Sequence, residues 1–176
     1  MVESPAKPAA KANSDDFVPP SYPEAHLLWH IAKKGFQAGS LGGVAVSAAY
    51  ALATRNRDPG AFLRRVGYGA MAGTALSSSL AAVKFTQIDK DGFHDRVYRL
   101  HYNTSQQRTD SFAWAGGLLG LVAAVVLLPE GGPGWAVAMV GGSGVGSALG
   151  VLAHVATRPP EQVYPNKALH ELVRDD

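Results

Sequence analysis

The sequence contains no cysteine and little charge. The absence of cysteine excludes disulfide bonds, thiolate ligands for zinc or iron–sulfur clusters, and cysteine nucleophiles. Charged residues make up 17% of the 176 residues, below the roughly 25% that is typical of soluble domains. The 16 Lys and Arg nearly balance the 14 Asp and Glu. The chain therefore lacks the basic excess of nucleic-acid-binding proteins, and we predict no nucleic-acid partner.

Four long segments contain no Asp, Glu, Lys or Arg at all. A helix needs about 20 apolar residues to cross a bilayer, and each segment has a suitable length. The three tryptophans, Trp29, Trp114 and Trp135, lie near the ends of these segments, as is typical of residues at a membrane–water interface. We predict an all-α protein that forms a four-span transmembrane helical bundle, with spans at about residues 35–54, 66–83, 111–129 and 134–157.

Glycine is concentrated in the four predicted spans, where it recurs at intervals of four residues. In a water-exposed helix each glycine would cost about 1 kcal/mol relative to alanine. Within lipid, small residues spaced by four let two helices approach closely. We therefore predict helix-packing faces that contain Gly35, Gly39, Gly43, Gly69, Gly73, Gly116, Gly120, Gly142, Gly146 and Gly150.

The polar residues divide the chain into three parts. Residues 21–157 form the predicted membrane domain, between an extended polar N-terminal tail at 1–20 and a polar C-terminal tail at 158–176. The N-terminal tail has no apolar core of a secretory signal, and it carries carboxylates that mitochondrial presequences avoid. We therefore expect no cleaved leader.

The longest polar connection, Lys84–Asp110, is predicted to contain its own helix. Phe93, Val97 and Leu100 recur there at helical spacing and would form one apolar stripe, against the membrane interface or against a partner.

The sequence offers few groups for catalysis. His26 and His30 could share a metal ion, but no third ligand lies at a suitable spacing. His154 is the one ionisable residue within a predicted span apart from tyrosines near span ends, and we expect it to point to the interface. This pattern argues against a transporter or a pump. We predict no catalytic, cofactor-binding or metal-binding residues, and we leave a structural phospholipid open.

Arginine and tyrosine cluster in the long connection, directly before the third predicted span. Both residue types are over-represented at the centres of protein interfaces. We predict that the connection docks to a partner protein through Arg96, Tyr98, Arg99, Tyr102 and Arg108. The alternative is a solvated helix with internal ion pairs.

The run Asp95–Asn103, with the sequence DRVYRLHYN, is followed by Arg108 and Asp110. This pattern resembles the loop of a small membrane accessory subunit of mitochondrial respiratory complex I, of the type known as NUXM, and the likeness extends over about Tyr22–Thr157. The resemblance implies a multi-pass protein of the mitochondrial inner membrane. It would be a non-catalytic subunit of this respiratory-chain enzyme that supports assembly and stability, with other membrane subunits and the lipid bilayer as its partners.

The four-span layout is also similar to that of the Tim-type proteins of mitochondrial import. That resemblance implies the alternative function of a component of a protein-import translocase or channel, and Ser77–Ser79 would supply a weakly polar face for it. The family's Arg-x-x-x-Asp pair is matched only in part, by Arg108 and Asp110. The side that would carry both termini is richer in lysine and arginine, which favours the matrix. The Tim-type resemblance favours the intermembrane space, so the orientation stays open.

Overall fold

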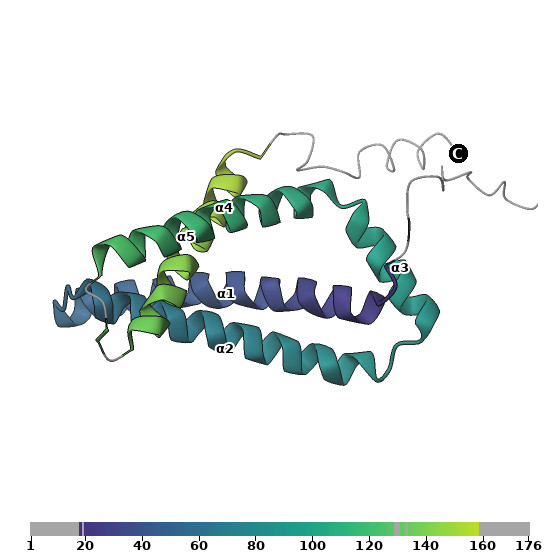
Figure 1. The fold of residues 1–176 in the computed structure, drawn as a ribbon, viewed down its shortest axis with the longest axis horizontal. Coiled ribbons are helices and arrows are strands. Elements are labelled where there is room, and N and C mark those ends of the chain that lie inside the picture. Colours follow the sequence, from purple (N-terminus) through teal and green to yellow (C-terminus); the bar gives the residue numbers. More distant parts are fainter. Residues whose placement is uncertain (1–17, 19, 129–130, 133, 159–176) are drawn as a thin grey trace, which may run out of the picture.

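The computed structural model describes residues 18, 20–128, 131–132 and 134–158. These residues form five α-helices and no strand, which confirms the predicted all-α class (Figure 1). The helices are α1 (Pro23–Thr54), α2 (Pro59–Phe85), α3 (Lys90–His101), α4 (Thr104–Leu127) and α5 (Trp135–Ala156). The two predicted tails lie almost entirely outside the described residues.

Two helical hairpins make up the fold. The first pairs α1 with α2, the second pairs α4 with α5, and α5 lies obliquely across α2 so that the hairpins are joined (Figure 1). The hairpin turns follow from local chemistry. Asp58 accepts a hydrogen bond from the backbone N–H of Gly60 (2.9 Å) and thereby caps α2. Gly131 and Gly134, with φ of 81° and 79°, form the turn before α5.

The helices of each hairpin are in backbone contact through glycine. A Cβ atom added to Gly69 would lie 2.8 Å from the carbonyl oxygen of Gly39. In the second hairpin, a Cβ atom added to Gly142 would lie 2.7 Å from the carbonyl oxygen of Gly120. Each of the ten glycines that we predicted to form packing faces lies against the neighbouring helix of its hairpin in this way.

A further set of small residues, which the four-residue spacing did not reveal, joins the two hairpins. A Cβ atom on Gly67 of α2 would lie 3.1 Å from the backbone nitrogen of Gly141 of α5. A Cβ atom on Gly144 would lie 2.9 Å from the hydroxyl oxygen of Ser40 on α1. On α5, Gly141 and Gly144 face the first hairpin, whereas the predicted Gly142 and Gly146 face α4, so α5 packs on two sides.

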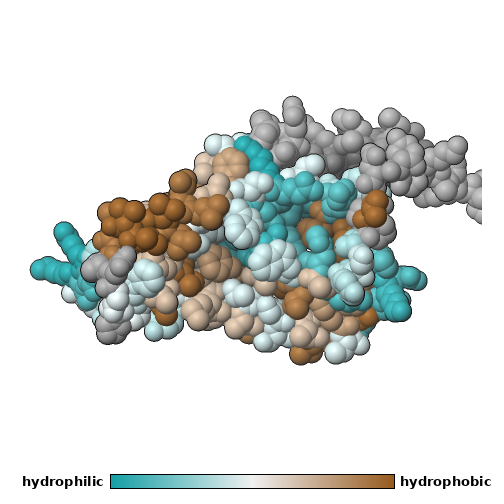
Figure 2. Space-filling model, viewed as in Figure 1, coloured by the Kyte–Doolittle hydropathy of each residue, from teal (hydrophilic) through white to brown (hydrophobic). Residues whose placement is uncertain are grey.

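The distribution of side chains is the reverse of that in a water-soluble bundle. The buried positions are mostly Gly, Ala and Ser, and the fully buried ones include Ser40, Ser47 and Ala70. Large apolar side chains point outward, with Leu52 82% exposed, Leu127 77% and Val126 75%. Figure 2 shows apolar side chains gathered over the C-terminal half of α4, and hydrophilic ones toward α3. Exposed apolar surface of this extent marks a contact with lipid or with another protein.

Three helices of the described chain, α1, α4 and α5, are long and apolar enough to cross a membrane. By length and composition, the structure therefore shows three of the four predicted spans, and α2, which contains the segment at 66–83, is not among them. The segment at 66–83 is uncharged, but its three Gly, three Ser and one Thr make α2 less apolar than the other three long helices. The predicted span at 35–54 is the C-terminal part of α1, which begins at Pro23.

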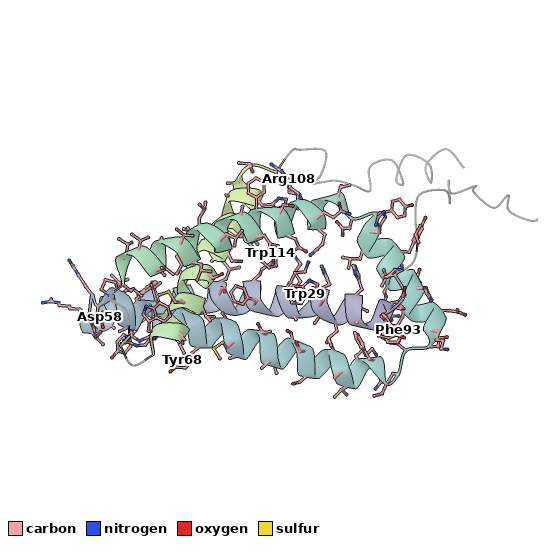
Figure 3. All side chains as sticks on the ribbon, in the orientation of Figure 1. Trp29, Asp58, Tyr68, Phe93, Arg108 and Trp114 are labelled. Carbon is pink, nitrogen blue, oxygen red and sulfur yellow. The ribbon has the colours of Figure 1, made fainter. Side chains whose placement is uncertain are left out.

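The predicted helix in the long connection is α3. Its side chains Phe93 and Val97 are buried, at 5% and 2% exposure, together with Leu27 of α1. The rings of Phe85 and Phe93 meet edge to face, with their centroids 5.0 Å apart. The apolar stripe of α3 therefore packs on the chain's own helices, and Figure 3 shows Phe93 at this junction.

Candidate functional site

Among the described residues, a dense group of charged side chains lies where α1 approaches the start of α4. Asp110 accepts a hydrogen bond from Lys34 at 2.5 Å, from Lys33 at 3.1 Å and from the amide of Gln37 at 3.2 Å. The Nδ1 atom of His30 lies 3.7 Å from the same carboxylate. We call these five residues the Asp110 cluster.

The Asp110 cluster is largely withdrawn from water. The Asp110 side chain is 14% exposed, and the side chains of Lys33 and Lys34 are 22% and 27% exposed. An ion pair at such sites is held by charge-assisted hydrogen bonds, and the loss of one partner leaves an uncompensated charge. One carboxylate here faces two ammonium groups, so the cluster carries a surplus positive charge even when His30 is neutral.

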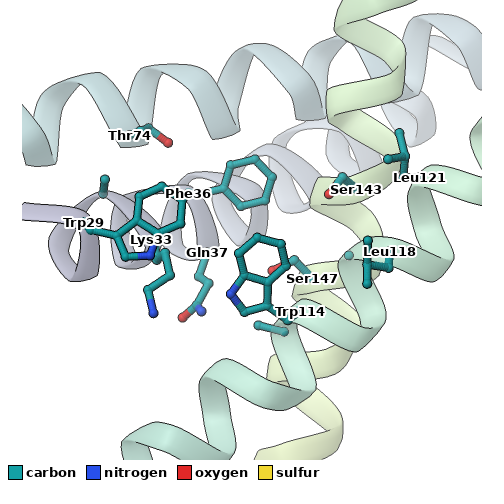
Figure 4. Close-up of a pocket in the computed structure, with 13 residues that line it drawn as sticks. Trp29, Lys33, Phe36, Gln37, Thr74, Trp114, Leu118, Leu121, Ser143 and Ser147 are labelled. Atoms are coloured by element: carbon teal, nitrogen blue, oxygen red, sulfur yellow. The ribbon is translucent and has the colours of Figure 1, made fainter. Parts of the chain in front are cut away.

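A cleft of about 310 Å³ begins at the cluster and runs between α1 and α4. Apolar side chains cover most of its walls, and Lys33 and Gln37 reach into one end of it (Figure 4). The side chains that line it are Trp29, Ala32, Lys33, Phe36, Gln37, Thr74, Ala113, Trp114, Gly117, Leu118, Leu121, Ser143 and Ser147. Two of the three tryptophans therefore border one cleft, besides lying near span ends.

Sequence reasoning missed the Asp110 cluster, although two signals for it exist. His30, Lys33, Lys34 and Gln37 follow the i, i+3, i+4, i+7 pattern, which places them on one face of a helix. Asp110 is the last charge before an uncharged segment that begins on the same side of the fold. Opposite charges at such corresponding positions can pair across helices.

The predicted docking residues fall into two groups. Four of them, Arg96, Tyr98, Arg99 and Tyr102, lie on or directly after α3 and are exposed. Arg96 donates to the carbonyl of Gly92 at 2.8 Å. Arg99 pairs with Asp95 one turn earlier, and the rings of Tyr98 and Tyr102 lie 4.8 Å apart.

Arg108, the fifth, is engaged within the chain. Its guanidinium donates to the carbonyl oxygen of Thr157 at 3.1 Å and to the hydroxyl of that residue at 3.2 Å. It also lies over the ring of Phe112, 5.1 Å from the centroid. This contact ties the start of α4 to the end of α5 (Figure 3). Partner docking through Arg108 would have to compete with it.

His154 does not point to the interface, and that expectation was wrong. Its side chain is buried at 3% exposure against Phe112, with the ring centroids 6.0 Å apart. The close crossing of α4 and α5 brings Phe112 over it. Among the described residues, its Nδ1 atom has no hydrogen-bond partner. The same part of the chain contains no group of three His, Asp or Glu side chains that could hold a metal ion.

Comparison with curated proteins gives no match. A family model described as "Protein of unknown function (DUF1757)" matches residues 13–154, which include all of α1 to α4 and most of α5. The match therefore covers both hairpins, the Asp110 cluster and the cleft. The chain belongs to the DUF1757 family.

Proposed function

We propose that the protein is a non-catalytic accessory subunit of the membrane arm of mitochondrial respiratory complex I, where it supports assembly and stability. The observation that carries the membrane part of this proposal is the reversed distribution of side chains. Large apolar residues such as Leu52 and Leu127 face outward, whereas glycine and serine fill the interior. In water this arrangement would leave the apolar surface unburied, but in lipid it places apolar side chains in an apolar solvent.

The packing of α2 supports a fourth crossing despite its composition. Helix α2 lies against α1 from Gly73 to Val66, and its 27 residues exceed the roughly 20 that a span needs. Its hydroxyl groups bond to helix carbonyls, since Thr74 donates to Ala70 at 2.8 Å and Ser77 donates to Thr74 at 3.1 Å. A bilayer that contains α1 would therefore also contain α2.

Membrane insertion has a direct test. We expect the protein to stay in the membrane pellet after extraction with alkaline carbonate, because apolar helices hold it rather than surface charge. A peripheral protein of the same organelle, followed in the same fractions, should appear in the supernatant. Recovery of the protein mainly in the supernatant would contradict the membrane proposal.

The exposed face of α3 supports a docking role. Phe93 and Val97 fix the helix on the bundle, so that Arg96 and Arg99 are presented from a rigid element rather than from a free loop.

The identity of the complex rests on the resemblance of Asp95–Asn103 to the complex I accessory subunit. The rival, a Tim-type channel, needs a polar face along a span. Ser77 instead donates across the hairpin to the carbonyl of Ile31 at 3.4 Å, which favours a packing role.

Charge reversal on α3 tests docking. We expect the double substitution Arg96→Glu and Arg99→Glu to weaken association with complex I, since interface anchors cost more than about 1 kcal/mol each when removed. Native electrophoresis of the membranes would report the assembled fraction. Activity normalised to assembled complex should stay near normal, because the proposed role is structural.

The matched control reverses Arg55 and Arg57, which are also exposed but lie at the opposite end of the bundle. We expect this control to assemble normally. Normal assembly of the α3 variant together with abolished specific activity would overturn the structural role and would favour a direct function of the loop.

A further inference from the structure

We propose that the cleft between α1 and α4 binds one anionic phospholipid, with an acyl chain along the cleft and the phosphate at Lys33. The inference rests on the proposed membrane location. It assigns a ligand of stated chemistry to the Asp110 cluster and the cleft together. The apolar walls of the cleft match one acyl chain, and its charged end matches the phosphate.

The apolar part of the cleft matches an acyl chain. Trp29 and Phe36 of α1 face Trp114, Leu118 and Leu121 of α4 across it (Figure 4). From Ala113 to Leu121 the cleft follows α4 for about 12 Å at 1.5 Å per residue, away from the charged end and toward the predicted middle of the span. Lining atoms that face an empty gap lose their dispersion contacts, so lipid hydrocarbon is favoured to fill it.

The charged end of the cleft matches a phosphate. Lys34 makes the 2.5 Å contact with Asp110 and is also held by Gln37 at 3.0 Å, so this ammonium is already balanced. Lys33, which lines the cleft, supplies the surplus charge. A phosphodiester carries one negative charge and would neutralise it in a region where unbalanced charge is costly.

The test uses the full chain reconstituted in phosphatidylcholine vesicles with the substitution Trp135→Phe. This variant keeps Trp29 and Trp114, which both line the cleft. Lipids with brominated acyl chains quench tryptophan on contact, and they are supplied either as phosphatidylglycerol or as phosphatidylcholine. One surplus positive charge near the headgroups is worth about 1 kcal/mol, so we expect brominated phosphatidylglycerol to be preferred about fivefold.

Two single substitutions separate the site from general surface charge. Lys33→Gln removes the surplus charge and keeps the Lys34–Asp110 pair, and we expect the preference to disappear. Lys84→Gln removes one charge from the end of α2 on the same side of the bundle, and it should keep the preference. An equal preference in wild type and Lys33→Gln, or none in wild type, would overturn the proposal.

Native mass spectrometry of the wild-type protein keeps the test independent of how the variants fold. We expect one phosphatidylglycerol to be retained per chain after removal from the vesicles. Equal retention of phosphatidylcholine, or retention of a second protein copy in place of lipid, would contradict the site. Failure of the chain to insert into vesicles counts against the membrane proposal, whereas insertion without lipid preference counts against this site alone.

Discussion

Replacing Gly39 by leucine should force α1 away from α2, whereas the same replacement three residues later, at Gly42, should leave the bundle intact. A Cβ atom on Gly39 would lie 3.0 Å from the Cα of Gly73 and would meet the carbonyl oxygen of Gly69 even more closely. These are backbone atoms and cannot turn aside as a side chain would. Overpacking of a tight interior costs about 1–3 kcal/mol or more, and we expect the upper end of that range here.

Gly42 provides the control because it lies on the same helix and is exposed. Among the described residues, no atom beyond the local backbone lies within 4 Å of a Cβ placed there. The change to leucine should even favour the helix slightly, since glycine costs about 1 kcal/mol relative to good helix formers. Thermal unfolding of the detergent-purified variants, followed by tryptophan fluorescence, should show a midpoint lower by roughly 6–12 °C for Gly39→Leu only. Equal midpoints would mean that the glycine face is not an interface.

The substitution Asp110→Asn should destabilise the protein by about 3 kcal/mol, because it leaves two lysines together without a counter-charge. Lys33 and Lys34 both contact the Asp110 carboxylate and are mostly shielded from water. Asparagine keeps the size of the side chain and one acceptor, so the effect reports charge rather than packing. The unfolding midpoint should fall by roughly 6–12 °C.

Asp58→Asn is the matched control at the other end of the bundle. The Asp58 carboxylate lies 3.8 Å from the Arg64 guanidinium, but the Asp58 side chain is 55% exposed. Exposed ion pairs contribute only about 0–1 kcal/mol to stability. Asparagine can still cap α2 as aspartate does. Similar unfolding midpoints for the two variants would show that the Asp110 cluster is a solvated surface network that does not stabilise the fold.

Composition and the spacing of glycine were sufficient to predict the helical class and the glycine contacts within each hairpin. Those features depend on residues close in sequence, such as Gly35 and Gly39, that must share a face of one helix. Helix α2 was counted with the other spans because it is uncharged, although absence of charge is a weaker criterion than hydropathy. Glycine and serine at a packing face lower the hydropathy of a helix without exposing a charge.

The contacts that sequence reasoning missed join helices from different hairpins. Asp110 and Lys34 are 76 residues apart in sequence, and their contact depends on the axial position and the tilt of α4 relative to α1. The burial of His154 depends in the same way on the α4–α5 crossing. Such registers are fixed by the sum of many small contacts, and no local pattern in one helix specifies them.

The interior of glycine and serine has a thermodynamic consequence. If the helices separate within a bilayer, the newly exposed faces meet hydrocarbon instead of water. The large heat-capacity change that accompanies unfolding of soluble proteins comes from hydration of apolar surface, and here that source is nearly absent. The stability of the bundle should therefore vary almost linearly with temperature, without the curvature that makes soluble proteins unfold in the cold.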